Sequence, residues 1–190
     1  MATTSATNSF LQRLIGAEAL DSAIYEEVEA DAGATVQAFA VVVLSSLAAG
    51  IGLSGLVAGG RGLTAGSAGD IFAVSVIALI AWAAWAMVTY QIGARLLPGP
   101  QTVVDVGELL RTIGFAAAPG LLQVFGIIPG AAIPAFAVSA VWMLLAMIVA
   151  VRQALDYTST RRAVEVCVLG WALALIIALV LGLLFGPTVS

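Results

Sequence analysis

The chain of 190 residues is 62% hydrophobic and only 9% charged, with a net charge of -4 and a mean hydropathy of +1.11. Soluble domains carry about a quarter charged residues, so this composition excludes an ordinary soluble globular fold. It predicts an all-α, polytopic membrane helix bundle, because helices satisfy their own backbone groups within a bilayer. At about 20 residues for each crossing, the length allows only a handful of transmembrane helices.

The scarcity of metal-binding residue types narrows the function classes further. The chain contains no histidine and a single cysteine, Cys167. One cysteine excludes an intramolecular disulfide, and without histidine it cannot form a conventional zinc site. We therefore expect no metal, no cofactor and no catalytic residues.

Residues 1–33 are expected to form a cytoplasmic segment with one amphipathic helix over residues 10–30. Apolar residues recur there at helical spacing, and the opposite face is acidic. Arg13 is the sole basic residue of this segment, so electrostatic attraction to anionic lipid headgroups is not expected. Two interpretations stay open, namely packing against the protein's own cytoplasmic face or docking of a partner.

Two apolar runs predict the first two spans, at residues 36–58 and 71–95. At a rise of about 1.5 Å per residue, each run covers a hydrocarbon core of about 30 Å. The connection between them is rich in glycine, but it lacks the Gly-Lys-Ser/Thr ending and the preceding strand of a phosphate-binding loop. We interpret it as a turn.

The next uncharged stretch, residues 112–151, is too long for one crossing and has the length of two. Pro129 and Gly130 place the turn, which predicts a third span at 105–128 and a fourth at 131–155. Pro119 and Gly120 fall inside the third span, where the missing amide donor is expected to kink or break the helix. Such prolines are tolerated in membranes when neighbouring groups satisfy the freed carbonyl. A fifth span is predicted at 163–185.

The arginines set the predicted orientation of these five spans, which place the two termini on opposite sides. Arg61 falls on one side of the predicted topology, and the other six arginines fall on the N-terminal side: Arg13, Arg95, Arg111, Arg152, Arg161 and Arg162. Cytoplasmic loops carry an excess of arginine and lysine. We therefore expect a multi-pass protein of the plasma (inner) membrane with a cytoplasmic N-terminus.

A cluster of charged residues is the main polar feature that this topology isolates on the cytoplasmic side: Asp105, Glu108, Arg111, Arg152 and Asp156. The first three share one helix face and the last two share another, so each helix has its own ion-pair partners. Arg111 is expected to pair with Glu108 or Asp156, because unpaired charge in a bilayer is costly. The cluster is interpreted as a clamp between the third and fourth helices, with a binding or transport role as the alternative.

Two segments of this region resemble the Yip family, membrane proteins named for interaction with Ypt/Rab GTPases, in its bacterial form. The segments are Asp105-Val-Gly-Glu108-Leu-Leu-Arg111-Thr-Ile-Gly-Phe-Ala-Ala-Ala-Pro119-Gly120, and Ala150-Val-Arg152-Gln-Ala-Leu-Asp156-Tyr157 followed by Arg161-Arg-Ala163. The resemblance spans most of the chain. For eukaryotic relatives it implies a cytoplasmic N-terminus, a lumenal C-terminus and roles in vesicle trafficking and membrane shaping. It also implies that the five charged residues matter as a set.

Two functional hypotheses follow from the sequence. The first is a non-enzymatic membrane scaffold or accessory subunit, favoured by the acidic N-terminal helix and by the lack of catalytic constellations. The second is a small transporter, channel or lipid-handling protein, favoured by the break at Pro119 and Gly120, because discontinuous helices line many substrate sites. The expected partners are membrane lipids and a protein partner or a second copy of the chain, with no nucleic acid.

Overall fold

A computed structural model describes residues 8–57, 68–99 and 105–185, and every element within these ranges is a helix. The helices are, in chain order, α1 (Phe10–Glu18), α2 (Ser22–Ala30), α3 (Ala34–Val57), α4 (Ala68–Tyr90), the π-helix η1 (Gln91–Leu96), α5 (Val106–Phe115), the 3-10 helix η2 (Ala118–Ile127), α6 (Ala132–Ala154) and α7 (Thr160–Phe185). The predicted all-α fold class is confirmed for these residues.

Four segments of the described chain are long and apolar enough to cross a membrane: Ala34–Ser54, Ile71–Leu96, Val106–Ile127 and Ala132–Ala154. They overlap the first four predicted spans, so the molecule is a helical protein with several apolar, membrane-length helices. The fifth predicted span, 163–185, lies within α7, which is not one of these four segments. Residues 58–67, which include most of the glycine-rich connection, lie outside the described residues.

The N-terminal segment forms two helices, where the sequence predicted one. Asp21 begins α2 because its side chain accepts a hydrogen bond from the Ala23 amide, as an N-cap residue does. Leu20 lies in the left-handed region with φ of 61°, and its amide donates to Ala17 O while the Asp21 amide donates to Gly16 O. These two bonds are those of a Schellman motif, which ends α1. The single amphipathic helix over 10–30 is therefore corrected to α1 and α2.

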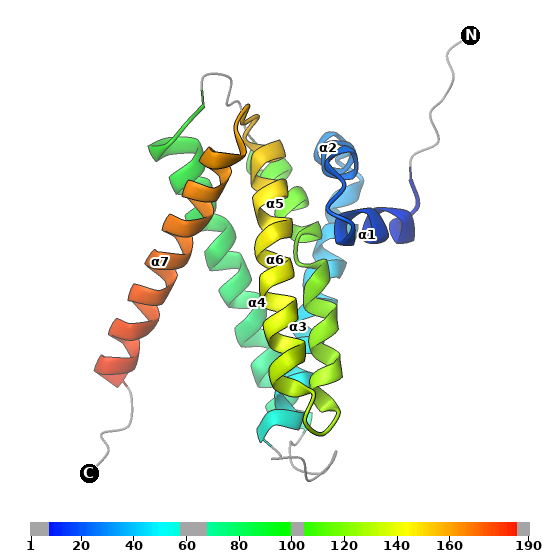
Figure 1. The fold of residues 1–190 in the computed structure, drawn as a ribbon, viewed down its shortest axis with the longest axis vertical. Coiled ribbons are helices and arrows are strands. Elements are labelled where there is room, and N and C mark those ends of the chain that lie inside the picture. Colours follow the sequence, from blue (N-terminus) through cyan, green and yellow to red (C-terminus); the bar gives the residue numbers. More distant parts are fainter. Residues whose placement is uncertain (1–7, 58–67, 100–104, 186–190) are drawn as a thin grey trace.

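The long helices share one general direction, and α7 diverges from the others toward its C-terminal end (Figure 1). One end of the bundle brings together the charged residues Glu29, Glu108, Arg111 and Asp156. At this end, called the polar end below, α2 packs against α5 and α6, α5 begins and α6 ends. α1 crosses the direction of the long helices instead of extending it (Figure 1). Large fully buried side chains concentrate near the polar end, among them Tyr25, Leu109, Ile113, Phe115 and Val151.

The third span changes its helix type part-way along its length. α5 ends at Phe115, η2 begins at Ala118, and the chain continues toward the far end of the bundle before it turns into α6 (Figure 1). Pro119 lies in the first turn of η2, where its missing amide leaves no carbonyl unpaired within the helix. This segment is the most enclosed of the four, with 61% of it buried against 11% for α4, so it forms the centre of the bundle.

Candidate functional site

Asp105 and Glu108 of the predicted cluster start helix α5. Asp105 is the N-cap residue, and its carboxylate accepts from the Gly107 amide at 2.9 Å. Glu108 reaches back to accept from the Asp105 amide at 3.0 Å, which completes a capping box. Both carboxylates thus satisfy amides that the first turn leaves without intrahelical partners. The acid-x-x-Glu spacing before an apolar run is the sequence signal for this role.

Arg111 connects α5 to the end of α2. Its side chain is 8% exposed, and its Nε donates to the backbone carbonyls of Val28 at 3.1 Å and Glu29 at 3.2 Å. These carbonyls belong to the last turn of α2, where a cation is stabilised by the helix dipole. Among the described residues Arg111 forms no ion pair with Glu108 or Asp156, so the expected carboxylate partner is replaced by a helix terminus.

Arg152 and Asp156 end helix α6, and they are not paired with each other in the described chain. The Tyr157 amide donates to Arg152 O, and the Asp156 amide donates to Gln153 O, both at 2.9 Å. Asp156 takes the left-handed position of this Schellman motif, with φ of 49°. A residue in that position no longer continues the helix, so the four-residue spacing from Arg152 does not bring the two charges onto one helix face.

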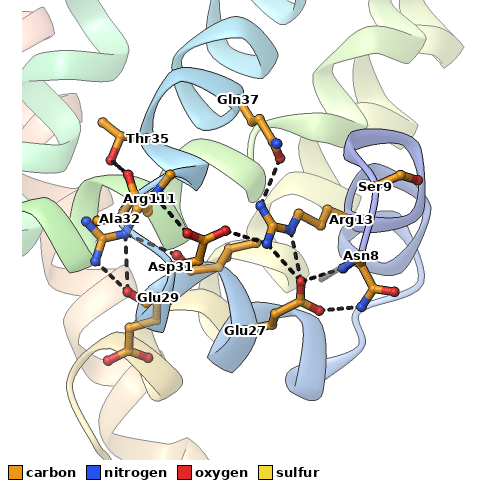
Figure 2. Close-up of polar contacts among 12 residues, drawn as sticks. Asn8, Ser9, Arg13, Glu27, Glu29, Asp31, Ala32, Thr35, Gln37 and Arg111 are labelled. Carbon is orange, nitrogen blue, oxygen red and sulfur yellow. Dashed lines mark hydrogen bonds and ion pairs between the residues drawn. The ribbon is translucent and has the colours of Figure 1, made fainter. Parts of the chain in front are cut away.

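Arg13 is the centre of a second polar network, which the sequence analysis did not predict (Figure 2). Its side chain is 2% exposed and pairs with Glu27 at 2.9 Å and Asp31 at 2.6 Å. It also donates to the Gln37 side chain of α3 at 3.1 Å, and Glu27 accepts from the amide and the side chain of Asn8. One guanidinium therefore joins α1 to α2 and α3. Five donors in a rigid fork make arginine suited to such a junction.

Four carboxylates from α2, α5 and the end of α6 gather at the polar end: Glu26, Glu29, Glu108 and Asp156. Burial, together with repulsion from Asp156, Glu108 and Glu26, raises the pKa of Glu29 to about 7, against a smaller lowering by Arg111. A groove beside them is lined by Glu26, Glu29, Arg152 and Asp156. The surface of the polar end is therefore acidic, and its negative charge is only partly balanced.

The pKa of Glu29 predicts that the protein loses stability as the pH rises. Between pH 4.5 and about 7 the folded state holds a proton on Glu29 that the unfolded state releases, so the free energy of unfolding falls over this window. The Glu29→Gln variant should remove this decline and gain about 1 kcal/mol at pH 8, a figure reduced for solvent screening of a half-buried group. Thermal unfolding in detergent at pH 5 and pH 8 measures it, with Glu165→Gln as the control. If the free energy of unfolding declined equally with pH in both variants, the raised pKa of Glu29 would not be the cause.

Hydroxyl groups of neighbouring helices bond to two backbone carbonyls at the change of helix type in the third span. Ser45 of α3 donates to Ala117 O at 2.8 Å, and Ser139 of α6 donates to Pro119 O at 2.9 Å. Gln123 donates in turn to the Ser139 hydroxyl at 3.2 Å. The break is thus closed by protein groups, which is how membrane helices tolerate an internal proline.

Removing one of these hydroxyls should destabilise the bundle. The Ser139→Ala variant removes the hydroxyl that donates to the buried Pro119 carbonyl and accepts from the Gln123 side chain, so the free energy of unfolding should fall by about 2 kcal/mol. Ser54→Ala is the matched control, because within the described chain the Ser54 hydroxyl donates to the carbonyl of Ile51 in its own helix. Its expected loss is about 0.5 kcal/mol or less. Unfolding in mixed micelles measures both, and equal losses would contradict the role given to Ser139.

A cavity of about 410 Å³ lies beside the break, between α3, α4, η2, α6 and α7. Ser45, Ser46 and Gln123 provide most of its few polar groups, and Trp82, Trp85 and Trp171 provide much of its apolar wall. None of the described residues that line it is charged. Its chemistry suits a neutral, apolar molecule and gives no charged ligand for an ion.

The part of the chain that the structure describes contains no group of three or more His, Cys, Asp or Glu residues that could hold a metal ion. No family model matches the chain, and no curated protein or solved structure matches it either. The resemblance to the Yip family therefore stays a prediction from the sequence.

Proposed function

We propose that the protein is a multi-pass scaffold or accessory subunit of a membrane assembly, of the Yip type, with five spans and its polar end in the cytoplasm of the plasma (inner) membrane. Arginine asymmetry supports the orientation, because Arg61 alone falls on the other side. The observation that carries the proposal is the fixed attachment of α1 and α2 to the bundle. Arg13 and Arg111 both bond to α2, and both are buried.

This attachment gives the cytoplasmic side a preformed acidic surface, built from Glu26, Glu29, Glu108 and Asp156. Burial is the first cause of the raised pKa of Glu29, and repulsion from Asp156, Glu108 and Glu26 adds to it, with a smaller opposing effect of Arg111. A partner with a basic cytoplasmic segment would relieve this repulsion, and charge complementarity mainly governs specificity and the association rate. We infer that the partner is a membrane protein whose cytoplasmic loop is rich in arginine or lysine.

Purification from native membranes tests this function. The tagged chain is cross-linked in the membrane and extracted in mild detergent, and we expect one stoichiometric partner with a basic cytoplasmic loop. The Glu29→Gln/Glu108→Gln variant should lower its recovery, whereas Glu165→Gln, an acid on the exposed start of α7, should not. Recovery of the chain alone or only as a homo-oligomer would overturn the accessory-subunit function.

The cavity beside Pro119 and Gly120 favours a second function, the handling of a neutral lipophilic molecule. Its volume of about 410 Å³ falls within the range of small-molecule sites, about 300–1,000 Å³. Flux of a lipid probe in proteoliposomes tests this function. The Ala49→Leu variant places a larger side chain in the cavity, and we expect it to abolish the flux. Unchanged flux in a folded Ala49→Leu protein would exclude the cavity as the route.

A further inference from the structure

The C-terminal end of α1 reaches the apolar part of α6, while Arg13 of the same helix pairs with Glu27 and Asp31 of the α2 segment. The indole nitrogen of Trp142 donates to the backbone carbonyl of Glu18, the last residue of α1, at 2.9 Å. Trp142 precedes the end of α6 at Ala154 by about 18 Å along the helix, from its rise per residue. Because α1 crosses the direction of the long helices (Figure 1), a bundle that spans the membrane holds α1 in the membrane plane.

The two sides of α1 differ in chemistry. Arg13 and Ala17 face the protein and are almost completely buried. Leu11 and Ile15, four residues apart and hence on one face, are 61% and 59% exposed. The charge of Arg13 is balanced by its two carboxylate partners in the interior, so the outward face of α1 presents these two apolar side chains without a basic residue.

A groove of about 530 Å³ continues this apolar surface from α1 onto α6. Ala19 and Leu20 line it on one side together with Glu18, its one acidic lining residue, and Val138, Val141 and Leu145 line it on the other. Val138 and Val141 are 53% and 63% exposed, and they belong to a membrane-length helix. The surface around α1 is thus continuous with the surface that α6 would present to lipid.

We propose that α1 is an in-plane membrane helix whose Leu11 and Ile15 side chains contact lipid acyl chains. Interfacial helices are commonly held by a basic face that attracts anionic headgroups, and α1 has none. The Arg13 network and the Trp142 bond hold α1 at this depth instead. This inference rests on the proposed insertion of the bundle in the membrane.

Spin labels test the inference. In a Cys167→Ala background, which removes the sole cysteine, nitroxides are attached in Leu11→Cys and Ile15→Cys variants and in two references. Val141→Cys reports the face of α6, and Glu26→Cys reports the exposed face of α2. The full chain is placed in vesicles of phosphatidylethanolamine and phosphatidylglycerol. We then measure how often each nitroxide collides with oxygen, which concentrates among the acyl chains, and with a water-soluble nickel chelate.

We expect the oxygen-to-nickel ratio at positions 11 and 15 to match that at 141 and to exceed that at 26 several-fold. Ratios at 11 and 15 that match position 26, with position 141 still in lipid, would overturn the placement of α1 alone. Slow collisions with both reagents at 11 and 15 would show a protein covering this face, which also overturns it. An aqueous position 141 would instead overturn the proposed membrane insertion.

Discussion

The Arg13→Ala variant is expected to lose about 3 kcal/mol of the free energy of unfolding and to release α1 from the bundle. The substitution leaves Glu27 and Asp31 without their buried partner and Gln37 without a donor. Breaking a buried ion pair by removing one member costs about 3–5 kcal/mol, and the partial exposure of both acids places this case at the lower end. Thermal unfolding in detergent, with limited proteolysis of the N-terminal segment, measures both effects.

Arg161→Gln is the matched control for Arg13→Ala. Arg161 pairs with Glu165 at 2.9 Å, the same distance as the Arg13–Glu27 pair, but its side chain is 87% exposed. Exposed pairs of this kind contribute between about 0 and 1 kcal/mol. Burial therefore decides the difference between the two variants. A loss below about 1 kcal/mol for Arg13→Ala, or unchanged proteolysis near α1, would contradict the central position of this arginine.

A comparable loss, about 3 kcal/mol, is expected for Gly52→Ala, at the contact between α3 and the 3-10 helix η2. A Cβ atom at position 52 would lie 1.9 Å from the backbone carbonyl oxygen of Gln123. Gly126 approaches the same place, with its own added Cβ 2.9 Å from Gly52 O. Backbone atoms cannot move aside as a flexible side chain can, so α3 and η2 must separate. Unfolding in mixed micelles measures the loss.

Gly130→Ala separates this collision from the general cost of replacing a glycine. Gly130 has φ of 81° and no atom within 4 Å of an added Cβ. Its expected cost is the strain of the left-handed backbone alone, about 1 kcal/mol. If Gly52→Ala costs no more than Gly130→Ala, the close contact between α3 and η2 is wrong.

Much of the helical framework could be predicted from the sequence, because hydropathy and proline positions act locally. Long apolar runs identified four segments that the structure also finds at membrane length. The position of the helix change in the third span is close to Pro119, as a missing amide donor requires.

The partners of the charged residues could not be predicted, because spacing along one helix says nothing about contacts between distant segments. Arg111 bonds to carbonyls more than 80 positions away in the sequence. The spacing of Asp105 and Glu108 fits two roles, ion pairs along the helix or a capping box at its start. The structure shows the capping box. The division of the N-terminal helix at Leu20 is a further case, since leucine seldom adopts a left-handed backbone.

The most direct test of the proposed membrane arrangement is the sidedness of two exposed positions at opposite ends of the bundle. Single cysteines are introduced as Thr158→Cys, after α6 at the polar end, and Pro129→Cys, in the turn before α6, with Cys167→Ala as background. A membrane-impermeant maleimide should label position 158 only in inside-out vesicles and position 129 only in right-side-out vesicles. Labelling of both positions from one side would contradict the crossing of α6, and labelling of position 158 from outside would contradict the cytoplasmic polar end.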